Sequence, residues 1–433
     1  MNTVLIGVLS FVVLLIFVFL HMPISIVMLI VGIVGYALVV SPQAALVKLG
    51  TDIFNNAAVY TLSVIPMFLL MGLFLGTSGL ARRLFDAFNA WLGHIRGGLA
   101  IASITACAFF SAVSGSNIGT AATIGKVAVP EMRTHKYKDS FSAGSVAAGG
   151  TLGILIPPSS LMIVYGALTE ESIGKLLIAG ILPGIMTAAL LAFTAWLLVR
   201  LNPGLAPTGE AAPFSVKMQS IKTIWPVPVI FLISMGGIWL GVFTATEGGA
   251  IGAFLSLLYA IITRQMSKKG LNSALEETAN VTAMIFLVII GGTLYGHFLT
   301  ATRIPLIMKD YIVALNLSPL LLIGLVFLVY FVAGFVMDAM AIIVIFTNLF
   351  YPLVTAAGYN GIWFGVITIL LCNIGFITPP VGPVSMVTAS ATNTPVEAVF
   401  KGVTPFWFAL IAATAILIAF PEIATYLPNM MKF

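Results

Sequence analysis

Long apolar runs recur along most of this 433-residue chain, separated by short polar stretches. A helix needs about 20 consecutive apolar residues to cross a bilayer. Runs of this length predict about ten crossings, at residues 3–20, 23–40, 60–77, 141–170, 175–199, 223–243, 246–263, 279–299, 361–391 and 402–427. The first run lacks a basic flank and a small-residue cleavage site, so we expect a helix there and not a signal peptide. The pattern predicts an all-α polytopic membrane protein.

Four apolar segments are interrupted near their centres. The crossings 141–170 and 361–391 are too long for one straight helix, and each contains a Pro-Pro pair. The segments 97–130 and 318–356 break at polar, glycine-containing centres, which indicates re-entrant helical hairpins that return to the side they left. Unwound backbone at membrane depth persists only where protein or a water-filled cavity satisfies its polar groups. Function is therefore expected at these four breaks.

Basic residues assign an orientation to this arrangement. If 97–130 and 318–356 are both re-entrant, five of the 19 Lys and Arg residues fall on one side of the membrane and the remaining 14 on the other. Lys and Arg are more frequent in cytoplasmic loops than in outer ones. We therefore predict that both termini face the outside, that the first hairpin opens to the cytoplasm and that the second opens to the outside.

The two halves of the chain share a spacing of 222 residues. The matched pairs at this offset are Pro130 and Pro352, Gly153 and Gly375, Pro157-Pro158 and Pro379-Pro380, Ala167 and Ala389, Gly180 and Gly402, and Pro183 and Pro405. Coincidence is the alternative, because glycine and proline are common in membrane helices. The spacing predicts an inverted repeat with copies at 1–200 and 223–433, joined by a polar cytoplasmic linker at 201–222. Inverted repeats with broken helices are typical of transporters.

Composition excludes several classes of protein. Apolar residues make up 60% of the chain and charged residues only 8%, and the mean hydropathy is +1.13. These values exclude a soluble enzyme and a disordered chain. The net charge of +5 comes from basic residues scattered at the ends of apolar runs, so no nucleic-acid-binding face is expected. The two cysteines, Cys107 and Cys372, lie inside apolar segments and indicate no disulfide or metal framework.

The breaks contain the chemistry for binding ions. Proline frees a carbonyl one turn earlier, and glycine lets the chain leave the helix. A hairpin tip that faces an unwound crossing gathers carbonyl and hydroxyl oxygens, which suit a dehydrated alkali cation, and the following helix N-termini suit a carboxylate. The alternatives are a simple kink at each Pro-Pro pair and a hydroxyl bonded to the preceding turn at each serine.

Asp338 is the acidic residue that lies deep within a predicted membrane segment. Intramembrane acids are costly and usually functional. The alternative is an N-cap for the second helix of the hairpin, a role compatible with cation binding.

Two segments, 80–95 and 303–315, place apolar residues on one face and charged residues on the other. We expect amphipathic arm helices at the membrane interface, which either tether a moving hairpin or are plain surface helices.

The order of these features resembles the large membrane subunit of TRAP transporters. The resemblance rests on the run 65–72, the tip Ser114-Gly115-Ser116-Asn117, the unwound segments 153–158 and 375–380, and the repeat. It implies sodium-driven symport of an acidic organic solute by an elevator motion in a bacterial inner membrane, with sialic acid or C4-dicarboxylates as solutes and the sialic acid branch as the nearer one. It also implies a separate small four-helix membrane subunit and a periplasmic substrate-binding protein, with sodium as coupling ion and no other cofactor.

The resemblance also implies two sodium sites and a neighbouring substrate site. The first sodium site would use Ser114, Asn117, Gly153, Ile156 and Pro158. The second would use Gly334, Asp338, Gly375, Thr378 and Pro380. This second set departs from strict symmetry, because Met337-Asp338 replaces Gly115-Ser116 at the offset of 222. The candidates for contact with the substrate are Ser116, Ser159, Ser160 and Gly382.

An ion channel and an intramembrane protease are the rival hypotheses. A channel also uses rings of carbonyls, but hairpins that open to opposite faces favour alternating access. A serine protease needs a base beside its nucleophile, and the sequence offers Ser114 no histidine at comparable depth. An aspartyl protease needs two buried acids, and only Asp338 is found. No enzymatic activity is expected.

Overall fold

The computed structural model describes residues 3–20, 22–76, 79–314, 318–335 and 337–431, and every regular element in that part of the chain is a helix. The first half contains α1 (Thr3–Phe19), α2 (Ile24–Val39), α3 (Pro42–Ala57), η1 (Tyr60–Ser63), α4 (Val64–Gly76), α5 (Leu80–Leu92), α6 (Gly98–Ser114), α7 (Asn117–Thr134), α8 (Asp139–Gly150), η2 (Thr151–Ile154), α9 (Ser160–Thr169), α10 (Ile173–Ala179) and α11 (Ile181–Leu201). The predicted all-α class is confirmed.

The second half follows two elements that connect the halves, η3 (Pro203–Leu205) and α12 (Phe214–Ile224). It contains α13 (Pro226–Trp239), α14 (Ala245–Ile262), α15 (Lys268–Ala301), α16 (Ile304–Ala314), α17 (Pro319–Gly334), α18 (Ala339–Ala356), α19 (Gly361–Ile377), α20 (Pro383–Thr392), α21 (Val396–Ala419) and α22 (Glu422–Asn429).

Both continuous helices and bent pairs of helices are long and apolar enough to cross a membrane. By length and composition, five described segments qualify as spans (Ile173–Leu201, α14, α15, α18 and α21), or up to seven with the bent pairs α3–α4 and α12–α13. Predicted crossings 3–20 and 23–40 are helices of only 17 and 16 residues. The predicted crossings 141–170 and 361–391 are each two shorter helices. The count of ten crossings stays a prediction, because it depends on how these short pieces combine.

Both predicted hairpins are pairs of helices that meet at a short turn. Segment 97–130 forms α6 and α7, and segment 318–356 forms α17 and α18. The predicted breaks in the long crossings are also present, one between η2 and α9 and one between α19 and α20. The peptide bonds Pro157-Pro158 and Pro379-Pro380 are both cis.

Helix boundaries recur at the spacing seen in the sequence. Helix α7 begins at residue 117 and α18 at residue 339, 222 later; α8 begins at residue 139 and α19 at residue 361, again 222 later. At this offset α2 corresponds to α14, α4 to α15, α7 to α18 and α9 to α20. The packing is reciprocal between the halves: α2 packs against α15 and α4 against α14, while α7 packs against α20 and α9 against α18. The halves are therefore intertwined. Their inverted relation across a bilayer stays a prediction.

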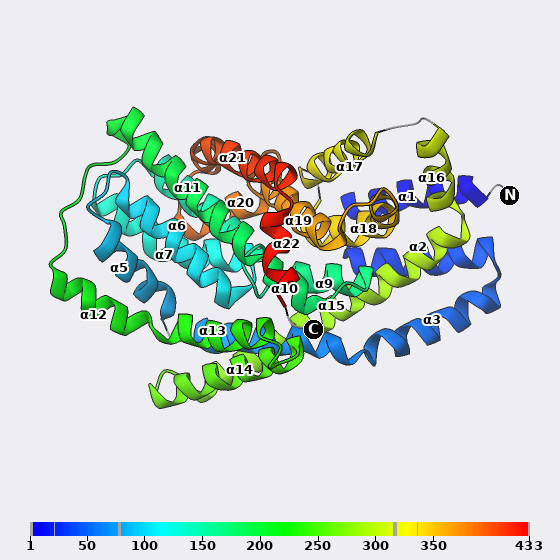
Figure 1. Ribbon diagram of the computed structural model, residues 1–433, viewed down its shortest axis with the longest axis horizontal. Helices are drawn as coiled ribbons and strands as arrows, with labels where there is room; N and C mark the ends of the chain where they lie inside the picture. Colours follow the sequence, from blue (N-terminus) through cyan, green and yellow to red (C-terminus); the bar gives the residue numbers. More distant parts are fainter. Residues whose placement is uncertain (1–2, 21, 77–78, 315–317, 336, 432–433) are drawn as a thin grey trace.

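The helices form two groups that we name the frame and the hairpin unit. The frame comprises α1–α4 and α13–α15, and the hairpin unit comprises α6–α11 and α17–α21. Figure 1 shows α3, α13 and α14 along the lower edge of the molecule, with α11, α17, α20 and α21 towards the top. Helix α5 joins the groups: it packs against α6, and Arg83 Nη1 donates to Tyr259 Oη of α14 over 3.1 Å.

Several helix ends differ from the bounds of the predicted linker and crossings. The linker 201–222 contains most of α12, which packs on α5 and accepts a hydrogen bond at Lys217 O from Trp91 Nε1 (3.2 Å). Helix α3 fills a stretch without a predicted crossing, because Lys48 and Asp52 interrupt its apolar residues. Helix α15 begins at residue 268 and not 279, because its first turns are charged. Helix α21 ends at residue 419, shortly before Pro421, and α22 is separate.

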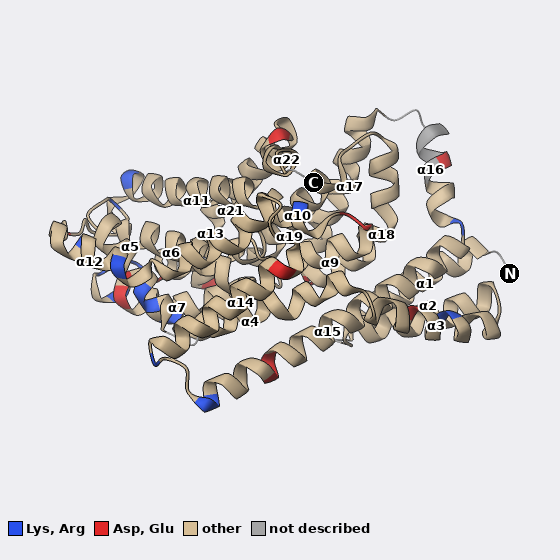
Figure 2. Cartoon of the chain, turned by 60° about the horizontal axis from the view of Figure 1, so that its bottom comes forward, with Lys and Arg blue, Asp and Glu red and all other residues tan. Residues whose placement is uncertain are grey.

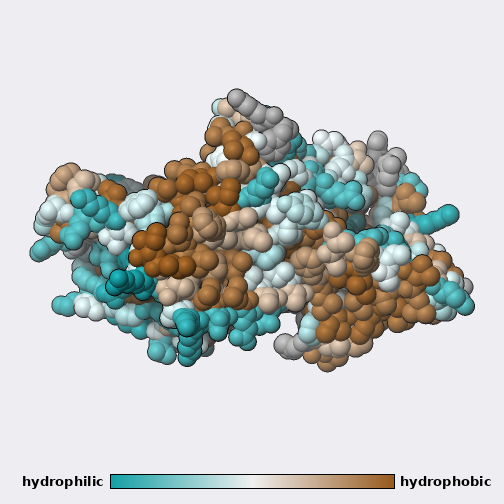
Figure 3. Space-filling view, turned by 90° about the horizontal axis from the view of Figure 1, so that it is seen from below, coloured by the Kyte–Doolittle hydropathy of each residue, from teal (hydrophilic) through white to brown (hydrophobic). Residues whose placement is uncertain are grey.

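The molecular surface has broad apolar areas between polar ends. Most Lys and Arg residues lie towards the end formed by α5, α7, α12 and the turn between α14 and α15 (Figure 2). The face in Figure 3 carries wide hydrophobic areas with hydrophilic residues towards its edges. Exposed apolar side chains include Leu46, Val47 and Phe54 of α3 and Phe254 and Ile262 of α14. Apolar surface of this extent is typical of contact with lipid or a membrane partner.

Candidate functional site between hairpin tips and broken helices

The tip of the first hairpin, residues 114–117, is built by a left-handed turn followed by a helix cap. Gly115 ends α6 with φ of +58° and donates its N–H to Ser111 O over 3.1 Å. Glycine adopts this conformation without a steric penalty. Ser116 then caps α7, because its Oγ accepts the N–H of Gly119 over 3.2 Å. The turn points the N-terminus of α7 at the broken segment between η2 and α9.

This first tip lies directly against the broken segment. Asn117 is 2% exposed, and its Oδ1 accepts the N–H of Ile154 over 2.8 Å. Ser160 Oγ donates to Gly115 O over 3.4 Å. A Cβ atom placed on Gly153 would lie 2.5 Å from the carbonyl carbon of Ser116, so only glycine permits this approach. Backbone atoms of the tip and of the break are thus in direct contact.

Oxygen atoms gather at this contact. Ser114 Oγ lies 2.6 Å from Thr120 Oγ1 and 3.3 Å from Ser116 O. A Cβ atom on Gly115 would lie 2.7 Å from Pro158 O, so that carbonyl faces the tip. The structure therefore brings together four predicted ligands of the first site: Ser114, Asn117, Gly153 and Pro158. The fifth, Ile156, is half-buried, and its side chain lies against Gly184 of α11.

Asn373 joins this first site to the second half of the chain. Asn117 Nδ2 donates to Asn373 Oδ1 over 2.7 Å, and Asn373 is 1% exposed. Its Nδ2 is one of the buried polar atoms without a partner among the described residues. Sequence reasoning did not select Asn373, although an amide inside the apolar run 361–377 was the available signal. Its counterpart at the offset of 222 is Thr151, so the contact is not duplicated by symmetry.

The second hairpin tip makes a looser set of contacts. A Cβ atom on Gly375 would lie 2.5 Å from Gly334 Cα, so α17 and α19 meet at two glycines. Asp338 is exposed and caps α18, accepting the N–H of Met340 over 2.8 Å. Thr378 bonds back to Ile374 O, and Pro380 is exposed. The structure joins Gly334 to Gly375 and gives Asp338 its capping role, whereas Val336 lies outside the described residues.

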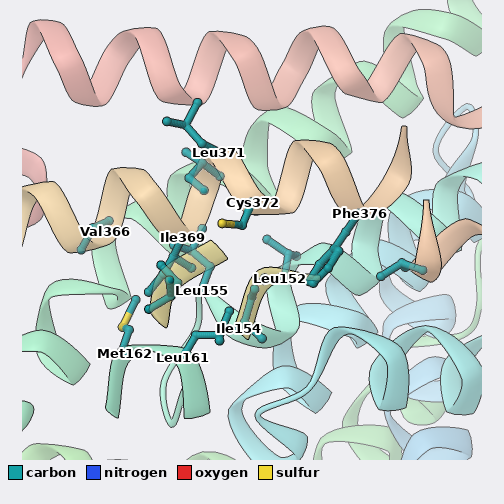
Figure 4. Packing of buried hydrophobic residues seen from close by; sticks show 14 of the residues in the cluster. Leu152, Ile154, Leu155, Leu161, Met162, Val366, Ile369, Leu371, Cys372 and Phe376 are labelled. Atoms are coloured by element: carbon teal, nitrogen blue, oxygen red, sulfur yellow. The ribbon is translucent and has the colours of Figure 1, made fainter. Parts of the chain in front are cut away.

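A tight apolar core lies between the two broken crossings. Figure 4 shows Leu152 and Leu155 of the first break facing Ile369 and Cys372 of α19, with Phe376 beside them. Leu152, Leu155 and Ile369 are completely buried. The first break is therefore packed tightly against α19, the helix that ends at the second break.

A cavity of about 550 Å³ opens beside the first tip. Three of its polar residues are predicted site residues, Ser114, Ser116 and Ser160. Ser159 instead caps α9 with its hydroxyl bonded to Ile154 O, and Gly382 lies against Phe400. Of the four substrate candidates, Ser116 and Ser160 therefore line this cavity and Ser159 and Gly382 do not. The rest of its wall comes from α4, α6, α7, α15 and α18.

A second cavity, of about 630 Å³, lies between frame and hairpin unit near the turns after α9 and before α14. Its polar residues include Asn56, Glu170, Glu171 and Thr246, and none of the predicted site residues lines it. The two cavities thus occupy separate parts of the boundary between frame and hairpin unit.

Polar contacts also fasten the base of each hairpin to the other half of the chain. Arg133 of α7 forms an ion pair with Asp139 (2.8 Å) and donates to Thr392 O and Thr394 Oγ1, both over 2.8 Å. Tyr351 of α18 donates to Glu171 Oε1 over 2.8 Å. Sequence reasoning missed the bonds to Thr392, Thr394 and Glu171, because these partners are far apart along the chain.

The frame contains a buried acid that sequence reasoning also missed. Asp52 of α3 is 4% exposed and lies 2.8 Å from His297 Nδ1 and 3.2 Å from Lys48 Nζ. The His297 ring thus contacts this carboxylate from α15. The pair connects α3 to α15 inside the frame.

Known proteins resemble the chain over nearly its whole length. Residues 11–423 match the family described as "Tripartite ATP-independent periplasmic transporter, DctM component". The C4-dicarboxylate TRAP transporter large permease protein DctM of Pseudomonas aeruginosa is 38% identical over 88% of this chain and 89% of that protein. The sialic acid TRAP transporter large permease protein SiaM of Vibrio cholerae is 29% identical over 92% of this chain and 95% of that protein.

A solved structure supports the same fold. The YdaH transporter of Alcanivorax borkumensis, described as having an unusual topology, superposes with a TM-score of 0.62 over 98% of this chain and 100% of that one, at 13% identity. Its helical architecture is therefore shared with the present chain. The family match extends over both hairpins and both broken crossings. The chain belongs to the DctM family, the large membrane permease component of tripartite ATP-independent periplasmic (TRAP) transporters.

Proposed function

We propose that this chain is the permease of a sodium-coupled importer that takes up an acidic organic solute by an elevator motion of the hairpin unit against the frame. The observation that carries the proposal is the contact between each hairpin tip and a broken helix. Such contacts place unwound backbone oxygens inside the protein, where a dehydrated cation finds ligands.

The first of these contacts fits sodium better than the second. Ser114 Oγ, the carbonyl of Pro158 and Asn117 Oδ1 surround the first tip. The second offers the backbone near Gly334 and Gly375, with the Asp338 carboxylate at the start of α18. A carboxylate that caps a helix keeps free lone pairs, so capping is compatible with cation binding. We propose one sodium ion at each tip.

The relatives point to an acidic solute, and they are named for two kinds of acid. The relative at 38% identity is named for C4-dicarboxylates and the one at 29% for sialic acid. This difference in identity favours a small carboxylate over the sialic acid branch that the family resemblance implied. The neutral hydroxyls of Ser116 and Ser160 in the cavity beside the first tip are suited to carboxylate oxygens.

The same family places the chain in a multicomponent system. The family description names it as one component of a tripartite periplasmic transporter. We propose that its partners are a separate small four-helix membrane subunit and a periplasmic solute-binding protein. The gathering of Lys and Arg around α5, α7 and α12 supports a cytoplasmic location for that end in a bacterial inner membrane and periplasmic termini (Figure 2).

Reconstitution tests this function. The purified chain, its small subunit and the binding protein are placed in proteoliposomes, and uptake of radiolabelled succinate and sialic acid is measured with an inward sodium gradient. We expect uptake that requires both the gradient and the binding protein. Equal uptake with potassium on both sides would contradict sodium coupling, and uptake without any binding protein would contradict the tripartite mechanism.

A further inference from the structure

The cavity beside the first hairpin tip contains one charged side chain. Its described lining consists of apolar groups, glycines, the hydroxyls of Ser114, Ser116, Thr123 and Ser160, and the carboxylate of Glu277. Glu277 is exposed, and among the described residues it has no ion-pair or hydrogen-bond partner. An anion held at the tip therefore shares its cavity with a negative charge that no described side chain of the lining compensates.

Glu277 belongs to the frame and the tip to the hairpin unit. Helix α15 packs against α2, α3 and α4, all frame helices. Glu277 lies nine residues after Lys268, near the start of α15. The turn before α15 belongs to the basic end of the molecule (Figure 2). Under the proposed motion the carboxylate would stay in place while the hairpin unit moves, and in this arrangement it lines the same cavity as the tip.

We infer that Glu277 weakens the binding of anionic cargo when the first tip is at the basic, cytoplasmic end, and so speeds release into the cell. This inference rests on the proposed function. Because the carboxylate is fixed in the frame, it does not repel the same cargo when the tip lies elsewhere. The asymmetry lowers affinity on one side of the membrane alone, which favours release of the cargo there.

The size of the cavity sets the expected effect. A sphere of about 550 Å³ is about 10 Å across, which is the separation of cargo and Glu277 at opposite walls. Two unit charges about 10 Å apart weaken binding about 15-fold at an effective dielectric near 20, and about fourfold near 40, so we expect roughly tenfold for this solvent-exposed carboxylate. None of the described residues in the cavity wall carries a positive charge.

The test compares neighbouring glutamates. Glu276 is also exposed and precedes Glu277 on α15, but it does not line the cavity, so Glu276→Gln is the matched control. The wild-type complex, Glu277→Gln, Glu276→Gln and Glu277→Asp are reconstituted with the small subunit and binding protein. Uptake of radiolabelled succinate and sialic acid is followed, and the half-inhibiting concentration of the same acid loaded inside the vesicles is measured.

We expect Glu277→Gln to lower the half-inhibiting internal concentration roughly tenfold, with an unchanged half-saturating external concentration and a lower maximal rate. Glu276→Gln should match the wild type, and Glu277→Asp should restore most of the wild-type behaviour. Identical internal inhibition in wild type and Glu277→Gln, with sodium-driven uptake intact, would overturn this inference alone. A change confined to the sodium dependence would also overturn it, because Glu277 would then be a cation ligand. Uptake of neither acid by the wild type would refute the proposed function as well.

Discussion

The close approach of Gly153 to the first hairpin tip predicts a strong effect of a single methyl group. In Gly153→Ala the new Cβ atom would lie 2.5 Å from Ser116 C and 2.6 Å from Asn117 N, with Ser116 O closer still. Ordinary contact begins at 3.4 Å, so the nitrogen alone must move by about 0.8 Å. All three neighbours are backbone atoms, and no change of rotamer relieves the clash.

This displacement falls on the predicted ligands of the first sodium site. Overpacking of this kind costs about 1–3 kcal/mol. If all of this energy goes into distorting the ligands at the tip, sodium affinity falls by a factor of about 5 to 150, since each 1.4 kcal/mol corresponds to about tenfold. The bond from the Ile154 N–H to Asn117 should lengthen at the same time, because its donor and acceptor lie on opposite sides of the clash.

A sodium titration of solute uptake measures the effect. We expect Gly153→Ala to raise the half-saturating sodium concentration within that range while the complex still elutes as a folded particle. Gly236→Ala in α13 is the control, since a Cβ atom there meets nothing within 4 Å and alanine favours a helix. A Gly153→Ala complex with an ordinary melting temperature and unchanged sodium dependence would refute the assignment of this contact as a sodium site.

Three further changes test other parts of the mechanism. Asp338→Asn keeps the cap of α18 but removes the charge, so we expect a several-fold higher half-saturating sodium concentration; an unchanged sodium titration would leave Asp338 with capping alone. Arg133→Gln removes an ion pair and hydrogen bonds to Thr392 and Thr394, so we expect about 1–3 kcal/mol of lost stability in denaturant unfolding, against no change for the exposed Arg82→Gln. Cysteine crosslinks from either hairpin to α15 or α4 should stop uptake, and full uptake with complete crosslinking would contradict the elevator motion.

Local sequence signals were enough to place the hairpins and the breaks. The two Pro-Pro pairs and the run 114–117 are short and strongly non-helical, so they marked the ends of α6, η2 and α19 within a few residues. Proline and glycine act on the backbone next to them, and this effect does not depend on distant partners. For the same reason the offset of 222 residues is visible in the amino-acid sequence alone.

Contacts between distant residues could not be predicted in this way. The Asn117–Asn373 bond joins residues 256 positions apart, and the Asp52–His297 pair joins residues 245 apart. Neither asparagine nor aspartate carries a local signal for its partner, and α3 was missed because its charged residues interrupt the apolar pattern. Tertiary burial of a polar group becomes visible only when the opposite helix is known.

The distribution of these distant contacts indicates how the hairpin unit would move. The first hairpin is held at its tip by Asn373 of α19 and at its base by the α20–α21 junction through Arg133. The second is held at its tip by Gly375 and at its base by Glu171. Each hairpin thus contacts residues in or next to a broken crossing at both of its ends. A flap-like opening would break polar contacts at both ends of the first hairpin, and in the second it would break the Tyr351–Glu171 bond and the glycine contact at the tip. Displacement of the whole unit breaks none of them. Under the proposed mechanism both sodium sites would therefore travel with the solute as one body, and the ratio of ions to solute would be set by the geometry of the unit and not by the order in which hairpins open.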